Sequence, residues 1–189
     1  MPNAHRSFYA DEVGGYRHWT HLSEELPAKV ASFFAVSTAR EDTFVAGLSM
    51  GGYGALKWAL RDPSRFAAAA SLSGVLDVAE SEHLRVRLES GQTRSEQIWG
   101  TRVWEDPGLD PRDDLFALLR TTPADRLPAL MVRCGEDDAR IAMNTRFADA
   151  LAEHGVEADV AWTPGDHTWD FWDAHIQDVL AWLPLRAPV

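Results

Sequence analysis

The chain has 189 residues with 46% apolar side chains, enough for one domain that builds its own core, and its 18 basic and 29 acidic residues give a formal net charge of −11. This acidic balance argues against nucleic acid or an anionic membrane as the main partner, because both need a basic face. The chain has a single cysteine, which excludes an internal disulfide. It contains no run of 18 apolar residues, the length needed to span a membrane. The first residues are not a signal peptide, so we expect a cytoplasmic location.

Segments with helical and strand-like patterns alternate along the chain. Apolar side chains recur at three- and four-residue steps over 16–34, which predicts a helix, and short apolar runs predict buried strands. The remaining expected elements, in chain order, are a strand over 43–46, a helix over 51–61, a strand over 66–72, irregular structure over 75–112, a helix over 113–120, a strand over 128–134, a helix over 140–153, a strand over 156–162 and a helix over 168–182. This order predicts an α/β fold whose mostly parallel sheet is covered on both faces.

The loops that follow the strands are the places to look for chemistry, because ligands of such sheets bind at the carboxyl ends of the strands. We expect a single domain over 1–189, in which 75–112 is a lid-like insertion. Trp99 and Trp104 in that insertion either line an acyl pocket or belong to the core.

The strand expected at 43–46 is followed by GLSMGG from Gly47, which contains the G-x-S-x-G pattern, and then at once by a helix. The glycines two positions before and after Ser49 allow a sharp turn that lifts the serine hydroxyl clear of the sheet. The backbone N–H of Met50 points to the same place and can stabilise an oxyanion. The pattern therefore predicts Ser49 as a nucleophile; the alternative is a tight glycine turn with a bystander serine.

A nucleophilic serine needs a base, and the base needs a carboxylate that orients it. Glu136, Asp137 and Asp138 follow the third strand, and His167 follows the fourth. The order Ser, Asp, His along the chain is typical of an α/β-hydrolase. We therefore predict Asp138 as the acid and His167 as the base, with Asp137 and Glu136 as alternative acids. In the alternative interpretation, the acidic turn caps the next helix and His167 is a polar loop residue.

Other side chains that could carry chemistry have a simpler structural explanation. His18 and His21 share a helical face and could bind a metal, but no third ligand is evident, so we expect a surface face. Cys134 ends a buried strand and is expected to be a small core residue. The remaining candidates are expected to be structural: His175 on the last helix, and Ser71 and Ser73 after the second strand.

Three stretches of the chain resemble the esterase family of α/β-hydrolases, which includes tributyrin-type acetyl esterases, S-formylglutathione hydrolases (esterase D) and antigen 85 mycolyltransferases. They are GLSMGGYGALKWALRDPSRFAAAASLSG from Gly47, CGEDD from Cys134 and PGDHTWDFWD from Pro164. The opening MPNAHRSFYAD and the segment EELPAKVASFF are similar to the tributyrin-esterase branch, so the resemblance covers essentially the whole chain. It implies a three-layer α/β-hydrolase sandwich. It also implies a role for four residues: Ser49 as nucleophile, Asp138 as acid, His167 as base and the Met50 N–H as one oxyanion donor.

Members of that family carry a further N-terminal portion, which forms the first strands of the sheet and supplies the second oxyanion N–H. The resemblance therefore implies that this chain corresponds to an N-terminally truncated fold. Residues 43–46 would then form an exposed edge strand with unpaired backbone groups. Three explanations stay open: a natural chain that begins further upstream, which is favoured; a true truncation; or strands supplied by a partner.

These observations predict a serine carboxylesterase that hydrolyses short-chain acyl esters or thioesters through an acyl-enzyme. No metal or other cofactor is implied. The expected partner is a small-molecule ester or thioester, without nucleic acid or membrane, and a homo-oligomer stays open. The alternatives are a truncated remnant that acts as a non-catalytic module, and an acyltransferase that uses the same triad.

Overall fold

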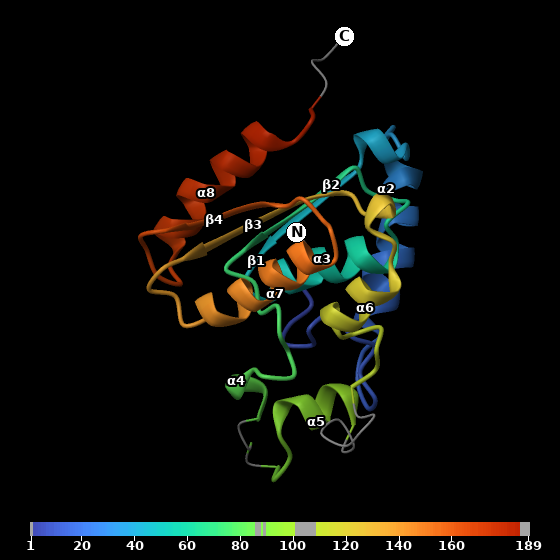
Figure 1. Ribbon diagram of the computed structural model, residues 1–189. Coiled ribbons are helices and arrows are strands. Elements are labelled where there is room, and N and C mark those ends of the chain that lie inside the picture. Colours follow the sequence, from blue (N-terminus) through green and yellow to red (C-terminus); the bar gives the residue numbers. More distant parts are fainter. Residues whose placement is uncertain (1, 86–87, 89, 101–108, 186–189) are drawn as a thin grey trace.

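The computed structural model describes residues 2–85, 88, 90–100 and 109–185 (Figure 1). In chain order, the elements are α1 (His18–Thr20), the π-helical turn η1 (His21–Glu25), α2 (Leu26–Phe33), the 3₁₀ turn η2 (Arg40–Asp42), β1 (Phe44–Leu48), α3 (Met50–Arg61), β2 (Ala68–Leu72), α4 (Glu82–Arg85), α5 (Arg94–Trp99), α6 (Leu115–Thr121), the 3₁₀ turn η3 (Ala124–Arg126), β3 (Ala129–Gly135), α7 (Ile141–Glu153), β4 (Asp159–Thr163) and α8 (Trp169–Trp182). Among the described residues, no helix is long and apolar enough to cross a lipid bilayer.

The four strands form one parallel sheet in the order β1-β2-β3-β4. In its register, Val45 pairs with Ala69, and Ala69 pairs with Leu130 on the next strand. Because all four strands run in the same direction, the loops that follow them emerge at one edge of the sheet. Within the described residues β1 pairs with β2 alone, so β1 is an outer strand, as the sequence predicted for residues 43–46.

Helices cover both faces of the sheet (Figure 1). Ala69 and Leu130 belong to the larger core cluster, on the face where α3, α6 and α7 pack. Ala70 and Met131, one position further along the same strands, belong to the second cluster, beneath α8. Successive side chains along each strand point to opposite faces of the sheet and thus contribute to two separate cores. The result is a three-layer sandwich, and the α/β fold class predicted from the sequence is confirmed.

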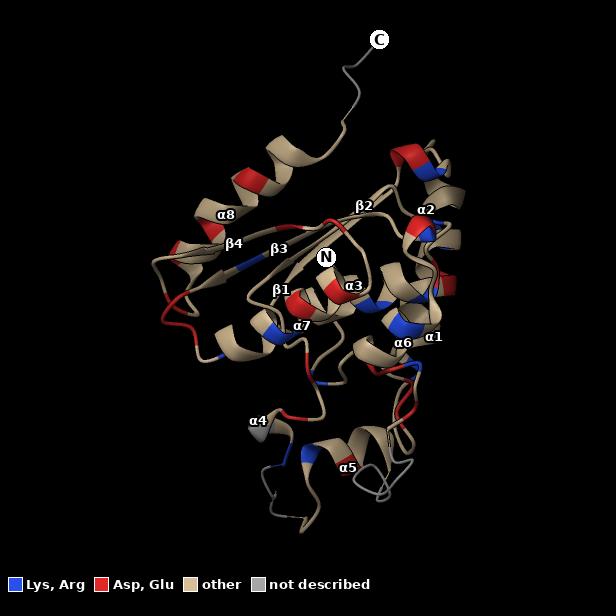
Figure 2. Cartoon of the chain, in the orientation of Figure 1, with Lys and Arg blue, Asp and Glu red and all other residues tan. Residues whose placement is uncertain are grey.

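The outer helix α8 shows how the sequence divides between core and solvent. Phe171, Trp172 and Val179 are buried against the sheet. Asp173 and Asp178 lie on the exposed side of the helix, and Figure 2 shows acidic residues but no Lys or Arg along α8. This helix therefore presents an acidic face to solvent and an apolar face to the sheet.

The helix predicted over 16–34 is formed by α1, η1 and α2, which follow one another without a gap, and its middle turn η1 is π-helical. Pro27 has no N–H, so the carbonyl of Ser23 loses its normal partner four residues on. The side chain of Arg65 donates to that carbonyl instead, over 3.3 Å. The N–H of Leu26 then bonds to the carbonyl of His21, five residues back, which is the π-helical spacing. The proline thus explains why the hydrogen bonds in the middle of this helix have the π-helical spacing.

The fourth strand begins at Asp159, later than the predicted start at residue 156. The preceding helix α7 ends at Glu153 and is followed by Gly155, which has φ +77°. The N–H of Gly155 bonds to the carbonyl of Ala152 and that of Val156 bonds to Leu151, which is the pattern of a Schellman motif. Val156 therefore closes the helix and does not begin the strand.

The region 75–112 leaves the sheet and forms α4 and α5 apart from it (Figure 1). A capping box between Thr93 and Glu96 begins α5. At its end, Trp99 packs against the main core, and its indole N–H donates to Asp113 over 2.7 Å, which favours the core interpretation of this tryptophan. Residue Trp104 lies outside the described residues. A lid role for 75–112 remains a prediction.

Candidate active site

Ser49 lies on a strained turn between β1 and α3. Its φ of +53° and ψ of −121° lie where side-chain-bearing residues are rare. A Cβ atom on Gly47 would lie 2.2 Å from the carbonyl oxygen of Gly51, and one on Gly52 would lie 2.5 Å from the Ser71 hydroxyl. The backbones therefore approach so closely that no side chain fits. These contacts give the physical reason for glycine at positions 47 and 52, whereas a Cβ atom on Gly51 would make only an ordinary contact, 3.5 Å from the Tyr9 hydroxyl.

His167 connects the serine to a carboxylate. It lies in the loop between β4 and α8, with Nε2 2.9 Å from the Ser49 hydroxyl and Nδ1 2.8 Å from Oδ2 of Asp138. The ring packs edge-on against Trp172, with centroids 4.7 Å apart and the planes at 90°. A carboxylate only accepts hydrogen bonds, so Nδ1 donates to Asp138 and Nε2 is left to accept from the serine. This is the tautomer that a general base needs.

Asp138 is the carboxylate that the β3–α7 loop directs to the histidine. Its side chain is fully buried, and its second oxygen accepts the backbone N–H of Arg140 over 2.9 Å. The two neighbouring carboxylates, Glu136 and Asp137, are exposed. Of the three acids left open by the sequence, Asp138 is therefore the one that contacts His167.

The surroundings of Asp138 keep it ionised. Burial alone would raise its pKa, but the hydrogen bonds from His167 and from the Arg140 backbone, with a contribution from the Ser73 side chain, lower this pKa to about 2. A charged carboxylate is therefore present next to His167 at neutral pH, where it can stabilise an imidazolium.

Ser73 is a residue of the site that the sequence interpretation assigned to an ordinary turn. It is buried at the end of β2, with φ +49°, and its N–H donates to the carbonyl of Arg133 over 2.7 Å. Backbone strain at a residue other than glycine often marks a functional site. The only feature of the sequence that pointed to a role of Ser73 in the site was its position directly after a strand.

Met50 is the first residue of α3. The N–H groups of the first helical turn have no acceptor within the helix, and the helix dipole makes this end partly positive. The N–H of Met50 is thus available beside the Ser49 hydroxyl for a developing negative charge.

A cavity of about 480 Å³ opens beside Ser49 and Met50. It extends along the outer strand β1, and its walls are mostly apolar. The walls include the side chains of Tyr9, Leu22, Leu26, Trp58 and Trp169. An uncharged substrate group placed in this cavity would lie next to the serine hydroxyl.

His18 and His21 each lie near an acidic side chain. His21 lies 2.9 Å from Glu25, and His18 lies 3.9 Å from Glu12. Within the part of the chain that the structure describes, no group of three or more His, Cys, Asp or Glu side chains could hold a metal ion.

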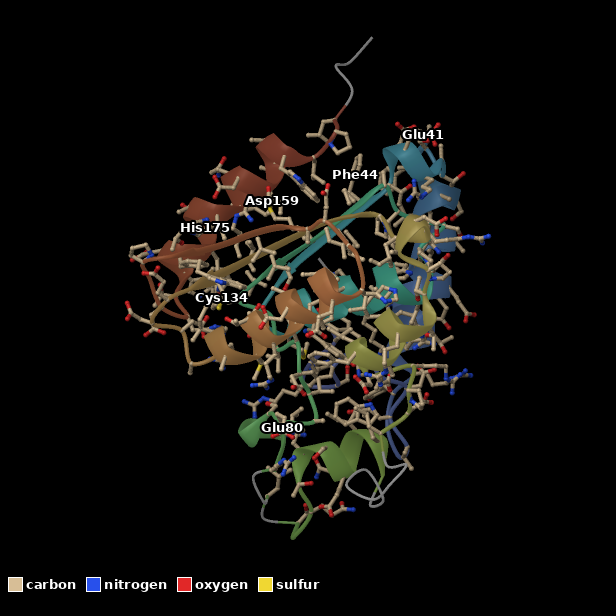
Figure 3. All side chains as sticks on the ribbon, in the orientation of Figure 1. Glu41, Phe44, Glu80, Cys134, Asp159 and His175 are labelled. Carbon is tan, nitrogen blue, oxygen red and sulfur yellow. The ribbon has the colours of Figure 1, made fainter. Side chains whose placement is uncertain are left out.

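Cys134 lies on β3 and His175 on α8 (Figure 3). Cys134 is buried in β3, and burial together with the charge of Asp138 raises the pKa of its thiol to about 12. His175 bridges β4 and α8, because its ring nitrogens contact Thr163 and Asp178 at 2.9 and 2.7 Å. Both side chains occupy structural positions.

Comparison with known proteins places this geometry in a family. The family described as "Putative esterase" matches residues 1–183. The acetyl esterase of Caldicellulosiruptor saccharolyticus is 26% identical over 188 residues, which cover 97% of this chain and 70% of that protein.

Two solved structures from Staphylococcus aureus are similar over almost the whole chain. The fluorophosphonate-binding serine hydrolase FphF, with substrate bound, superimposes with a TM-score of 0.84 at 30% identity. The superposition covers 98% of this chain and 71% of the FphF chain. The S-formylglutathione hydrolase FrmB superimposes with a TM-score of 0.80 at 31% identity, covering 97% and 70%. The chain therefore belongs to the "Putative esterase" family of α/β-hydrolase-type carboxylic ester hydrolases.

Proposed function

We propose that this chain is a serine carboxylesterase that hydrolyses short-chain acyl esters or thioesters through Ser49, His167 and Asp138. The observation that supports this proposal best is the position of the His167 ring. One of its nitrogens lies 2.9 Å from the Ser49 hydroxyl and the other 2.8 Å from the buried Asp138 carboxylate. This is the arrangement that activates a serine for acyl transfer.

Acylation begins when the Ser49 oxygen attacks the carbonyl carbon of the ester and its proton moves to Nε2 of His167. Asp138 stays ionised and stabilises the imidazolium. The negative charge that develops on the carbonyl oxygen is stabilised by the N–H of Met50. The bond between the carbonyl carbon of this tetrahedral intermediate and the alcohol or thiol then breaks. The alcohol or thiol leaves with the proton from His167, and the acyl group stays on Ser49 as the acyl-enzyme.

Deacylation repeats these steps with water in place of serine. His167 takes a proton from the water molecule as its oxygen attacks the acyl-enzyme, and then returns that proton to the Ser49 oxygen. The free acid leaves and the starting state is restored.

Two observations favour small, uncharged acyl groups. The cavity beside Ser49 has mostly apolar walls, and its volume of about 480 Å³ is that of a site for a small molecule. Among the similar proteins are an acetyl esterase and an S-formylglutathione hydrolase, and acetyl and formyl are small acyl groups.

The test is covalent labelling with a fluorophosphonate, read by intact mass, together with hydrolysis of p-nitrophenyl acetate. The serine oxygen displaces fluoride from phosphorus, so one label adds to the unmodified chain. We expect no label and no hydrolysis in Ser49→Ala, whereas the exposed-serine control Ser64→Ala should match the unmodified chain.

The other outcomes decide between the alternatives. Folded protein that is neither labelled nor active would overturn the proposal in favour of a non-catalytic module. Labelling with transfer of the acetyl group to an added alcohol, in place of its release as acetate, would identify an acyltransferase.

A further inference from the structure

Tyr9 is far from the triad in sequence, and its role in the site rests on the proposed function. Tyr9 lines the same cavity as Ser49 and Met50. Its ring lies directly on α3, because a Cβ atom on Gly54 would lie 2.4 Å from Cδ2 of Tyr9. A glycine inside a helix costs about 1 kcal/mol relative to alanine, and here it makes room for the tyrosine ring.

The backbone at Tyr9 is held in an uncommon conformation. Phe8 and Tyr9 have φ values of +50° and +52°, in the left-handed region that side chains disfavour. The N–H of Tyr9 donates to the hydroxyl of Ser7 over 3.1 Å. Two consecutive residues of this kind persist only where the surrounding structure holds them in place.

A buried lysine on α3 supplies that support. The ammonium group of Lys57 donates to the carbonyl oxygen of Tyr9 over 2.9 Å and lies 3.5 Å from that of Phe8. Its third contact is the carboxylate of Asp113, at 2.6 Å. The side chain of Lys57 is fully buried, so the three protons of the ammonium are all directed at protein oxygens.

Asp113 ties this contact to the insertion. Its other carboxylate oxygen accepts the indole N–H of Trp99 over 2.7 Å, and its backbone carbonyl accepts the hydroxyl of Tyr53 over 2.7 Å. Arg61 lies 3.7 Å from the same carboxylate. The segment of Tyr9, the helix of the nucleophile and the region 75–112 are therefore joined through one buried ion pair.

We propose that Tyr9 is a specificity-determining residue, whose ring limits the substrate group that occupies the cavity beside Ser49, and that Lys57 and Asp113 position it. Tyr9 contacts the substrate, and Lys57 acts only through Tyr9. A purely structural role for the ion pair would affect all substrates alike, whereas a wall of the cavity discriminates between substrates by size.

The first measurement compares kcat/KM over two substrate series, one with a growing acyl chain and a fixed alcohol, the other with a growing alcohol and a fixed acetyl group. Removing the ring in Tyr9→Ala should change the ratio of kcat/KM between the longest and the shortest substrate of one series by about tenfold or more. One methylene group in an apolar pocket can change kcat/KM by that factor. Gly54→Ala, which pushes on the ring, should shift the ratio in the same series.

The ion pair is tested with the charge-neutral double variant Lys57→Met/Asp113→Asn, because Lys57→Met alone would leave the buried carboxylate with only the more distant Arg61 as its cationic partner. We expect its ratio to shift in the same series as that of Tyr9→Ala. The matched controls are Lys29→Met, an exposed lysine, and Gly14→Ala, at a glycine with nothing within 4 Å of the added Cβ. Both controls should retain the ratio of the unmodified chain.

A second measurement follows the ring itself without enzyme activity. With 3-fluorotyrosine in all three tyrosine positions, the ¹⁹F resonance of Tyr9 is assigned from its loss in Tyr9→Phe. Burial raises the pKa of Tyr9, so releasing the ring in the Lys57 and Gly54 variants should move its titration to lower pH.

The outcomes separate this inference from the proposed function. The specificity role is overturned if the chain is active and Tyr9→Ala leaves the ratio of kcat/KM between long and short substrates unchanged. This includes the case in which kcat/KM falls by the same factor for all substrates. A ¹⁹F titration unchanged in the Lys57 and Gly54 variants overturns the positioning role. A chain that hydrolyses no ester overturns the proposed function and the specificity role with it, while the ¹⁹F measurement still decides whether Lys57 holds Tyr9.

Discussion

The backbone N–H of Ser49 donates a 2.8 Å hydrogen bond to the carbonyl of Leu72, so the ladder between β1 and β2 continues up to the nucleophile. The loops of the acid and the base are joined in a similar way, because the N–H of Glu136 donates to the carbonyl of Thr163 over 2.9 Å. The positions of the proposed catalytic groups therefore follow from the ends of paired strands. Changing one of these side chains should alter the chemistry and leave the backbone in place.

Replacing the buried acid should test its role directly. In Asp138→Asn the amide can present its NH₂ group to Nδ1 of His167, which favours the tautomer that cannot accept the proton from Ser49. We expect kcat/KM for p-nitrophenyl acetate to fall by about 10³- to 10⁴-fold, with an unchanged circular dichroism spectrum.

The matched control is Asp137→Asn, because Asp137 is the exposed neighbour of the same loop. Its kcat/KM should stay within about twofold of the unmodified chain. Full activity in Asp138→Asn combined with a large loss in Asp137→Asn would assign the acid to Asp137 instead.

The low pKa of Asp138 predicts a loss of stability in acid. Its pKa is about 2 in the folded state and 3.8 for the free side chain, so the unfolded chain binds the proton first as the pH falls. The stabilisation is complete above about pH 5 and is lost progressively as the pH falls toward 2. It amounts to roughly 2 kcal/mol.

Urea unfolding at several pH values between 6 and 2 measures this effect. Other acids titrate in the same range, so the informative quantity is the difference between the unmodified chain and Asp138→Asn. That difference should shrink as the pH falls through this window. A difference that is constant with pH would show that the carboxylate is not stabilised in the folded state.

The sequence was informative where local rules decide the structure. The loops that carry Ser49, Asp138 and His167 could be located because each directly follows an apolar strand, and a parallel sheet brings such loops to one edge. The sequence favoured Asp138 but left Asp137 and Glu136 as alternatives, because all three have the same chemistry and only the turn after β3 decides which one is buried.

The contact between Tyr9 and Gly54 shows what the sequence could not reveal. These residues are far apart along the chain, and no periodicity or motif links them. The only signal was a glycine within a helix, which indicates a close approach without naming what approaches. Lys57 was equally hidden, since its ion pair depends on where Asp113, which is distant along the chain, lies in the fold.

The free cysteine should be unreactive in the folded protein. Burial and the nearby charge of Asp138 raise the pKa of Cys134 to about 12, and only the thiolate reacts with iodoacetamide. Alkylation at pH 8 should therefore be slower by about 10³-fold than in urea, where the thiol regains its ordinary pKa. Intact mass follows both reactions. Rapid alkylation of the folded chain without loss of structure would contradict the buried position of this thiol.

The glycine before the nucleophile should be the most sensitive position of the turn. A methyl group at Gly47 would lie 2.2 Å from the carbonyl oxygen of Gly51, a backbone atom that cannot rotate away. We expect Gly47→Ala to lower the free energy of unfolding by about 1–3 kcal/mol and to slow fluorophosphonate labelling, because relief of the clash displaces Ser49 from His167. Gly14→Ala adds the same methyl group in open space and serves as the control. Gly47→Ala could instead have the same free energy of unfolding and the same labelling rate as this control. The turn would then accommodate a side chain, and the close approach of the two backbones would not be what requires glycine there.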